Sequence, residues 1–289
     1  MNIKKLKYIL ISCLLIALPY SAFAQGNAQA GKFGSQYNYK TKNTATYNPT
    51  PIRVTPFTVK GGTQISIIAP QKWNSIAGQL KQSLKDTHTY FTRLFGPIPT
   101  FKSTVKLMDD EAFYQATGAP RWTNAMYYKE QIIIPLPSRN NAKIDYNELY
   151  RSVKHEYTHA VIHSLSNGKC PGWLDEGLAQ WAEGEENPAL QPALLDWLQY
   201  NRPVSLDLLQ GGFTKLQVGM VPAAYAQSLF AANTMIDFHG LDDIQMYFSA
   251  LRSGFDNEEA FKMGFRITEK DFEKSLGSKL EKWAHSHAH

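Results

Sequence analysis

The first clear pattern in the chain is an alternation of hydrophobic and polar positions over residues 52–69. A period of two places successive side chains on opposite faces of a β-strand, so this stretch predicts strand structure. The pair Gly61-Gly62 interrupts the alternation and predicts a hairpin turn. Over residues 71–94 the apolar spacing becomes helical, and Gly96-Pro97 ends it. We therefore expect a β-hairpin followed by a helix.

Shorter elements are expected between residues 104 and 136. The pattern predicts a strand over 104–108 and a short helix over 110–117. Two short strands follow within 125–136, and they join at Lys129-Glu130-Gln131.

Residues 146–166 form the next predicted helix, and they hold most of the chemical information in the chain. Asn167-Gly168 supplies a stop signal. The apolar positions recur at helical spacing, and they are Val153, Tyr157, Ala160, Val161 and Leu165. An amphipathic helix of this kind buries one face, so we expect its histidines to point inward.

The helix carries the motif H-E-x-x-H, in which His155 and His159 enclose Glu156. Residues four apart lie on one helix face, roughly 6 Å apart, so both imidazoles can bind one cation. Zinc accepts such nitrogen ligands in tetrahedral geometry. Glu156 can reach a water at the metal without being a ligand itself, which is the position of a general base. The pattern alone also occurs by chance in helices that bind no metal.

A third ligand is expected from the segment PGWLDEGLAQW at residues 171–181, which begins a second helix after a Gly/Pro turn. Sixteen residues separate His159 from Glu176, which is enough for an antiparallel helix to bring Glu176 back to the metal. His163 is a poorer candidate, because eight residues of helix place it about 12 Å from His155. We expect His163 to pack in the core or to contact a metal ligand rather than the metal.

These two segments resemble the gluzincin metallopeptidases, and most closely the peptidase MA-like family. The matching residues are HEYTHAVIH and PGWLDEGLAQWAEG, and a looser resemblance covers residues 52–283. The metzincin class is excluded, because it needs glycine and histidine where Ile162 and Leu165 stand.

The resemblance implies that His155, His159 and Glu176 bind one zinc ion per chain and that Glu156 is the catalytic base. The family pattern puts the ligand immediately before Gly177, so Asp175 is expected to be a helix cap or a solvated acid.

The fold that the resemblance implies is α+β. A small mixed sheet would stand over the active-site helix, and a mainly helical subdomain would follow. The edge of such a sheet can pair with an extended peptide, and Tyr127, Tyr128 or residues 132–135 are candidates for that edge. The alternative is that this hairpin only covers the core. The large aminopeptidase branch carries G-x-M-E-N in this neighbourhood, whereas residues 124–128 read NAMYY without the glutamate. Aminopeptidase action is therefore not supported, and an endopeptidase is the default expectation.

The rest of the chain is predicted to be mostly helical. Residues 188–200 form a helix, 202–221 a loop, and 223–239 a helix that resembles the family's Y-x-Q-S helix near the metal. Tyr225 in this helix is a candidate hydrogen-bond donor to the oxyanion, although a tyrosine in a core helix is otherwise commonplace. Amphipathic helices are expected over 242–283.

Composition and charge add the cellular context. The chain has 289 residues, of which 43% are hydrophobic and 19% charged, as in ordinary globular proteins. Residues 1–24 combine three lysines, an apolar run and Ala22-Phe23-Ala24, which predicts a signal peptide cleaved after Ala24. The run is too short for a comfortable membrane span. We therefore expect a periplasmic or secreted protein, with lipoprotein processing at Cys13 as a less favoured alternative.

Cleavage would remove three lysines and no acid, which lowers the net charge from +5 to +2. Nothing in this balance suggests a nucleic-acid partner. Only Cys170 would remain, so no disulfide framework is expected. Residues 25–51 are predicted to be a flexible lead-in. Residues 52–285 would form the peptidase domain, with an α/β part over 52–166 and a helical part over 167–285.

The function expected from the sequence is a zinc-dependent metallopeptidase that acts on peptides or proteins. A competing interpretation is a binding or assembly protein that keeps the fold and hydrolyses nothing. A third is a zinc hydrolase that acts on a non-peptide amide.

Overall fold

The computed structural model describes residues 51–119, 121, 123–138, 143–184, 187–211, 213 and 216–287. The predicted signal peptide and all but the last residue of the predicted lead-in lie outside the described residues.

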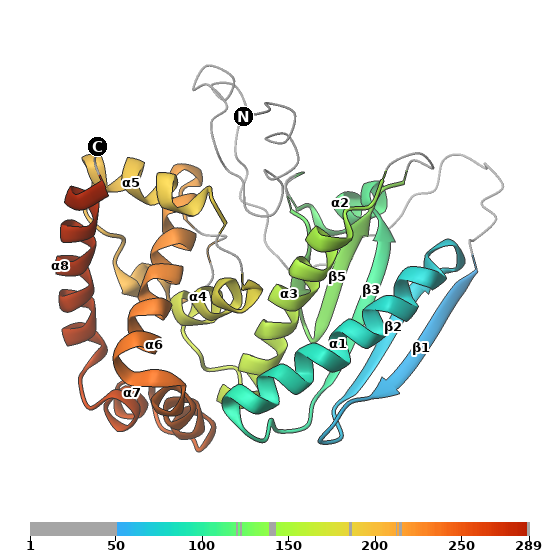
Figure 1. Cartoon of the computed structure of the whole chain (residues 1–289), viewed down its shortest axis with the longest axis horizontal. Helices are drawn as coiled ribbons and strands as arrows, with labels where there is room; N and C mark the ends of the chain where they lie inside the picture. Colours follow the sequence, from blue (N-terminus) through green and yellow to red (C-terminus); the bar gives the residue numbers. More distant parts are fainter. Residues whose placement is uncertain are drawn as a thin grey trace, which may run out of the picture.

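The N-terminal part is a five-stranded mixed sheet (Figure 1). Its strand order is β1-β2-β3-β5-β4; β2, β3 and β5 run parallel, and both outer strands are antiparallel to their neighbours. The strands are β1 (Ile52–Thr58), β2 (Gln64–Pro70), β3 (Lys102–Asp109), β4 (Met126–Tyr128) and β5 (Gln131–Leu136). Parallel neighbours need a crossover connection, which the helix α1 (Asn74–Phe95) supplies between β2 and β3 after the 3₁₀ turn η2 (Gln71–Trp73).

The two hairpins join where the sequence predicts. Gly61 and Gly62 both have positive φ, which glycine adopts without steric cost, in the turn between β1 and β2. Lys129 and Glu130 form the turn between β4 and β5, also with positive φ, as a two-residue type I′ turn requires.

The structure corrects one expectation about the sheet edge. β5 lies between β3 and β4, so Ile132 and Ile133 pair on both sides and are not an edge, whereas among the described residues Ile134 and Pro135 pair with β3 alone. β4 is the outer strand instead, and it carries Tyr127 and Tyr128. Alternation could not distinguish the two strands, because it reports which face is buried and not which strand is outermost.

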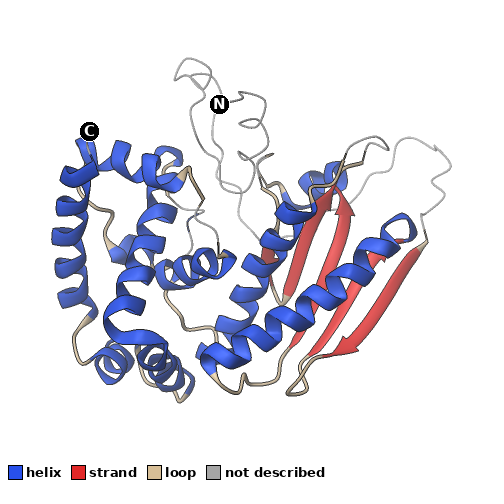
Figure 2. Cartoon of the chain, viewed as in Figure 1, coloured by secondary structure: helices blue, strands red, loops and turns tan. Residues whose placement is uncertain are grey.

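Two long helices cover one face of the sheet, α1 and α3 (Tyr146–Ser166) (Figure 2). Alternate strand residues are buried under them, and these include Ile65, Ile67, Val105, Leu107, Ile132 and Ile134. The short helix α2 (Asp110–Thr117) follows β3 directly.

The second part is helical and packs beside α3 (Figure 1). It consists of α4 (Gly172–Glu183), α5 (Leu190–Tyr200), α6 (Val221–Arg252), α7 (Asn257–Phe265) and α8 (Glu269–His287). The predicted loop over 202–221 contains two 3₁₀ turns, η3 (Leu206–Leu209) and η5 (Val218–Met220). α6 consists of two helical segments that meet at the predicted His239-Gly240 boundary. Gly240 has φ 75° and ψ 173°, which is not a helical conformation, so the helix is interrupted there before it resumes.

A mixed sheet followed by helices confirms the predicted α+β fold. In the described part of the chain, every helix is too short or too polar to cross a bilayer.

Candidate metal centre

The helix α3 presents the H-E-x-x-H motif, and local signals define both of its ends. The Asp145 side chain accepts hydrogen bonds from the backbone N–H groups of Asn147 and Glu148, which caps the first turn. At the other end Asn167 adopts the left-handed conformation that often terminates helices. The helix therefore has the bounds that the sequence predicts, and His155 and His159 lie one turn apart on it.

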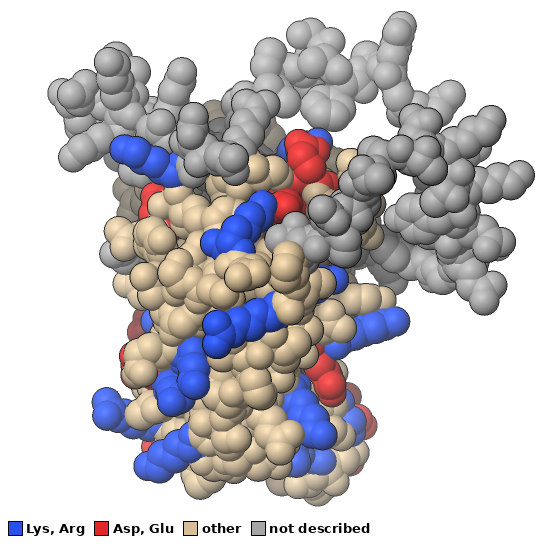
Figure 3. Space-filling view, turned by 90° about the vertical axis from the view of Figure 1, so that its right-hand side faces the viewer, with Lys and Arg blue, Asp and Glu red and all other residues tan. Residues whose placement is uncertain are grey.

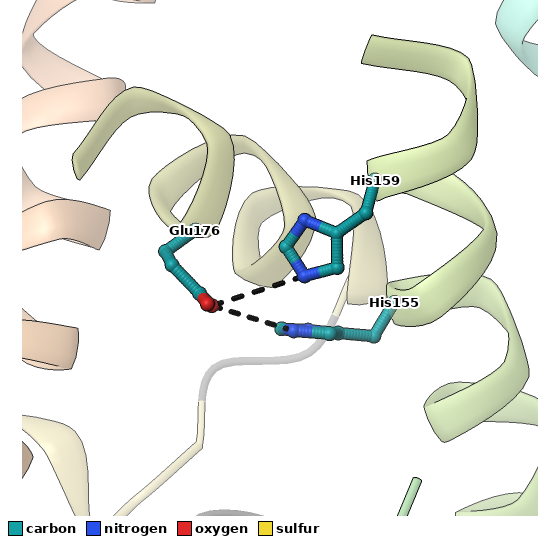
Figure 4. Close-up of side chains that lie close together, drawn as sticks. All are labelled: His155, His159 and Glu176. Atoms are coloured by element: carbon teal, nitrogen blue, oxygen red, sulfur yellow. Dashed lines mark ion pairs between the residues drawn. The ribbon is translucent and has the colours of Figure 1, made fainter. Parts of the chain in front are cut away.

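Glu176 comes back to these histidines from α4, as expected (Figure 4). One ligand atom from each of the three residues lies within 4.8 Å of the other two. The Glu176 Oε2 atom is 3.6 Å from His155 Nε2 and 3.9 Å from His159 Nε2. Two ligands of a tetrahedral zinc ion lie roughly 3.4 Å apart, so the spacing is close to that of a metal site.

The Glu176 Oε2 atom is buried and has no hydrogen-bond partner among the described residues. A buried acceptor without a partner costs free energy, so native proteins rarely leave one. A cation between the carboxylate and the two imidazoles would satisfy this atom. The donor set of two histidines and one glutamate is also one that catalytic zinc sites use.

Close packing between α4 and α6 positions Glu176. A Cβ atom at Gly177 would lie 2.2 Å from the backbone oxygen of Ser228 and 2.8 Å from the Ala232 Cβ. Only glycine allows the two helices to approach this closely. The glycine that follows the ligand therefore has a packing role.

Each histidine has a second carboxylate on its other nitrogen. His155 Nδ1 lies 2.8 Å from Glu183 Oε1, and His159 Nδ1 lies 3.0 Å from Asp175 Oδ1. These contacts hold the rings with both Nε2 atoms turned toward Glu176. Metal-binding histidines usually have such outer partners, which fix the tautomer and the ring orientation.

The expectation for Asp175 was therefore wrong. It lies in the first turn of α4, but no side chain caps that helix, and the Asp175 carboxylate contacts His159. The packing of α4 against α3 decides this, because it brings the Asp175 carboxylate within reach of the His159 ring.

Sequence reasoning missed Glu183 altogether. It follows Glu176 by seven residues, which is about two helical turns and places both carboxylates on the same face of α4. That spacing was the available signal. Glu183 also lies 3.6 Å from Arg151 Nε, and Arg151 forms an ion pair with Glu148 one turn earlier on α3. Ion pairs thus connect the donor cluster through Glu183 and Arg151 to Glu148 near the start of α3.

The charges around the histidines favour a cation at this site. Burial by itself would lower the pKa of His155. The neighbouring carboxylates of Glu176 and Glu183 have the larger combined effect, and they raise this pKa well above its usual value. Burial likewise opposes ionisation of His159, and Asp175 and Glu176 together raise its pKa to about 9. Burial alone would raise the pKa of Glu176, yet His155 and His159 hold it below its usual range. The field that stabilises imidazolium would also stabilise a metal ion.

Glu156 lies beside the cluster and is only 8% exposed. Burial raises the pKa of its carboxyl, and the neighbouring His155 and His159 offset part of the rise. A hydrogen bond from the backbone of Tyr127 also favours the ionised form. Glu156 therefore contacts the outer strand β4 as well as the histidines, and its proton affinity is higher than that of an exposed glutamate.

Tyr127 and His163 lie at the margin of the site. The Tyr127 ring stacks on His159 with centroids 6.4 Å apart, and it meets His163 edge-on at 6.5 Å. Burial raises the pKa of Tyr127 to about 12, so the phenol keeps its proton at neutral pH. His163 is exposed and lies outside the donor cluster, as expected for a residue that is not a ligand.

Tyr225 lies near the start of α6, where its ring packs edge-on against Phe213 at 4.8 Å. Its backbone carbonyl accepts a hydrogen bond of 3.0 Å from Gln180, one turn after Glu176 on α4. The Tyr225 backbone is thus attached to the ligand-bearing helix, while its role as an oxyanion donor stays a prediction. Gln227 in the same Y-x-Q-S segment bonds to both backbone groups of Val204, so it holds the preceding loop.

A family model described as the Peptidase MA superfamily matches residues 100–278, which include the whole cluster. Aminopeptidase A of Legionella pneumophila, solved with aspartic acid, is a similar structure. The two are 19% identical with a TM-score of 0.50, and the match covers 78% of this chain and 28% of that one.

A mutant of the M1 zinc metallopeptidase from Deinococcus radiodurans matches at 15% identity and a TM-score of 0.46, over 78% of this chain and 51% of that one. A mutant of the same enzyme bound to Tyr-Ser-Ala gives 15% identity and a TM-score of 0.44, over 80% and 51%. This chain thus spans between about a quarter and a half of the length of these structures. At such identities the likeness concerns the fold alone. No curated protein sequence matches the chain.

Proposed function

We propose that this chain, which belongs to the Peptidase MA superfamily, is a zinc-dependent peptidase. The observation that carries the proposal is the convergence of His155, His159 and Glu176, with a buried Glu176 oxygen that has no hydrogen-bond partner in the described part of the chain. One zinc ion per chain would bind these three side chains. Glu183 and Asp175 would orient the two imidazoles from behind.

The chemistry divides between the metal and Glu156. When bound, zinc supplies Lewis-acid polarisation of a peptide carbonyl. Glu156 takes a proton from the water that attacks the carbonyl carbon, and a C–O bond forms. Glu156 then passes this proton to the leaving amine as the C–N bond breaks. Its raised pKa suits both transfers, because a buried carboxyl holds a proton more readily than an exposed one.

Two further features would serve the substrate. An extended peptide would add as a strand to β4, which pairs only with β5 in the described part of the chain. The Tyr225 phenol would donate a hydrogen bond to the oxyanion. Because residues 124–128 lack the amine-binding glutamate of the large aminopeptidases, cleavage within peptides is the proposed mode. The signal-like residues 1–24 make the periplasm or the exterior the proposed location.

Metal content and hydrolysis of a quenched-fluorescence peptide library test the proposal together. The parent should hold about one zinc ion per chain and cleave part of the library. His155→Ala should lose both properties, whereas His163→Ala, on the exposed side of the same helix, should keep both. Glu156→Gln should keep the metal and lose hydrolysis.

The other outcomes identify the competing functions. A parent that holds zinc but cleaves only non-peptide amides would be a different zinc hydrolase. A parent that binds no zinc, even after metal addition, would contradict the proposal and favour a binding or assembly protein.

A further inference from the structure

Charge is distributed very unevenly along this chain. Residues 51–108 contain eight Lys and Arg but only one acidic residue, Asp86, which makes this segment +7. Residues 109–289 contain sixteen Lys and Arg against twenty-four Asp and Glu, which makes them −8. The near-neutral total therefore hides a strongly basic segment, which forms β1, β2, β3 and α1. Such asymmetry within one chain points to an anionic partner.

The basic segment is displayed on the side of the molecule that lies at the right of Figure 1. Lys and Arg side chains are spread over the uncovered surface there, and Asp and Glu are fewer (Figure 3). The acidic metal centre belongs to α3 and α4, away from β1. An anionic surface would thus be attracted to the part of the protein that β1, β2, β3 and α1 form, and repelled by the part that holds the metal centre. Of the eight basic residues, Lys81, Lys85 and Arg93 lie on α1, whereas Lys102 and Lys106 lie on β3.

The strand alternation places two of the lysines on the sheet face opposite α1 and α3. In β3 the residues Ser103, Val105 and Leu107 are buried, so Lys102 and Lys106 point to the other face. The register sets Lys106 between Ile68 of β2 and Ile133 of β5. We call this surface the open face, and define it by Ile52, Val54, Ile68, Lys102, Lys106 and Ile133.

Two more lysines border the open face at one end. Lys60 lies in the turn between β1 and β2, and Lys129 lies in the turn between β4 and β5. Lys102 begins β3 at the same end, where it pairs with Gln64. Glu130 is the acidic residue in this group. The basic groups therefore form a border along one end of the sheet.

The open face is also apolar. Ile52 is 70% exposed and Val54 is 55% exposed, both on the outer strand β1. A row of paired residues crosses four strands on this face. Three of its side chains are aliphatic and one is a lysine, and in strand order they are Val54, Ile68, Lys106 and Ile133. Exposed aliphatic residues that lie together commonly mark an interaction surface.

We propose that the open face docks on an anionic phospholipid bilayer. Lysines at the border would interact with phosphate headgroups, and Ile52 and Val54 would enter the boundary between headgroups and acyl chains. The exposed aliphatic residues favour a bilayer over a nucleic acid, whose phosphate backbone would contact the lysines but leave these side chains in water. The inference does not depend on hydrolysis, because the open face lies across the sheet from α3.

Sedimentation with lipid vesicles tests the proposal on the expected mature chain from residue 25. The chain should bind vesicles of equal parts phosphatidylcholine and phosphatidylglycerol, and bind pure phosphatidylcholine far more weakly. Lys102→Glu/Lys106→Glu should weaken binding by about tenfold or more, because each lysine contributes to surface attraction. Lys270→Glu/Lys282→Glu is the matched control. It changes net charge equally at exposed positions of α8, and it should lose only a small part of the affinity.

Two further variants keep the test valid if charge reversal disturbs folding. Lys102→Gln/Lys106→Gln removes the charges without adding acids, and Ile52→Ser/Val54→Ser removes the apolar contact. Both should weaken binding to the anionic vesicles. Equal binding by the parent and all open-face variants would overturn the proposal, as would an equal loss in the α8 control. Tighter binding to a DNA or RNA duplex than to the vesicles would also overturn it, in favour of a nucleic-acid partner.

Discussion

Glu183 Oε1 lies 2.8 Å from His155 Nδ1, and this contact determines which nitrogen of the histidine is presented to Glu176. The carboxylate comes from the last turn of α4, whereas the imidazole comes from the middle of α3. It leaves Nε2 as the nitrogen that faces the cluster. Four predictions test this contact and its surroundings.

Removing the Glu183 carboxylate should weaken metal binding without abolishing it. We expect Glu183→Ala to raise the zinc dissociation constant by about 10- to 100-fold, because the His155 ring loses its orienting partner. Competition with a chromogenic chelator measures this constant. Glu281→Ala, at an exposed position of α8, is the control and should leave it unchanged. Identical affinities in the parent and Glu183→Ala would show that the contact does not position the ligand.

The metal-free protein should lose stability as pH rises from about 6.5 to 9. Both histidines have a pKa in the folded state that is higher than in the unfolded state. Their protonation therefore stabilises the fold fully below about pH 6.5. This contribution is lost as the pH rises through the folded-state pKa, which is about 9 for His159. The loss for His159 is roughly 3 kcal/mol at most. Thermal unfolding of the chelated protein at both ends of this range measures it.

Zinc loading and His159→Gln serve as controls for this pH effect. The zinc-loaded protein should show a smaller fall in Tm, because the metal replaces the protons on the imidazoles. The fall should also shrink in chelated His159→Gln. A Tm of the chelated parent that rises over the same pH range would contradict the assignment of charge to the cluster.

A methyl group at Gly177 should separate α4 from α6. Gly177→Ala places a Cβ 2.2 Å from the Ser228 backbone oxygen, and overpacking of this kind costs about 1–3 kcal/mol. Since Glu176 is the adjacent residue, metal affinity should fall as well. Chemical denaturation measures the free energy of unfolding, and chelator competition measures the affinity.

Gly78→Ala is the matched control for this substitution. Gly78 lies in α1, and a Cβ there meets nothing within 4 Å, so alanine should be neutral or stabilise by up to about 1 kcal/mol. Gly177→Ala with parental stability and affinity would show that α4 and α6 can move apart freely.

Loss of the Tyr225 hydroxyl should reduce turnover and leave the metal in place. If the phenol stabilises the oxyanion, Tyr225→Phe should lower kcat by about 10²- to 10³-fold with a small change in KM. Tyr200→Phe removes a hydroxyl from a tyrosine that is 80% exposed, and it should retain full activity. A Tyr225→Phe enzyme with parental kcat would contradict the oxyanion role and leave the tyrosine a structural one, such as its packing against Phe213.

The sequence by itself determined the elements whose signals are local. Asp145 and Asn167 mark the ends of α3 through bonds to residues within a few positions of each, and the spacing of His155 and His159 places them on one face. Glu176 was expected from its place in the motif. The three donors could therefore be named before their geometry was known.

Only the tertiary structure decided which side chains surround those donors. Asp175 contacts His159 and Glu183 contacts His155 because α4 packs against α3, and no local pattern states how two helices will cross. The same holds for β4 as the outer strand and for the position of Lys106 between Ile68 and Ile133 on the open face. Capping and periodicity depend on near neighbours in the chain, whereas strand order and partners across helices depend on packing between distant segments.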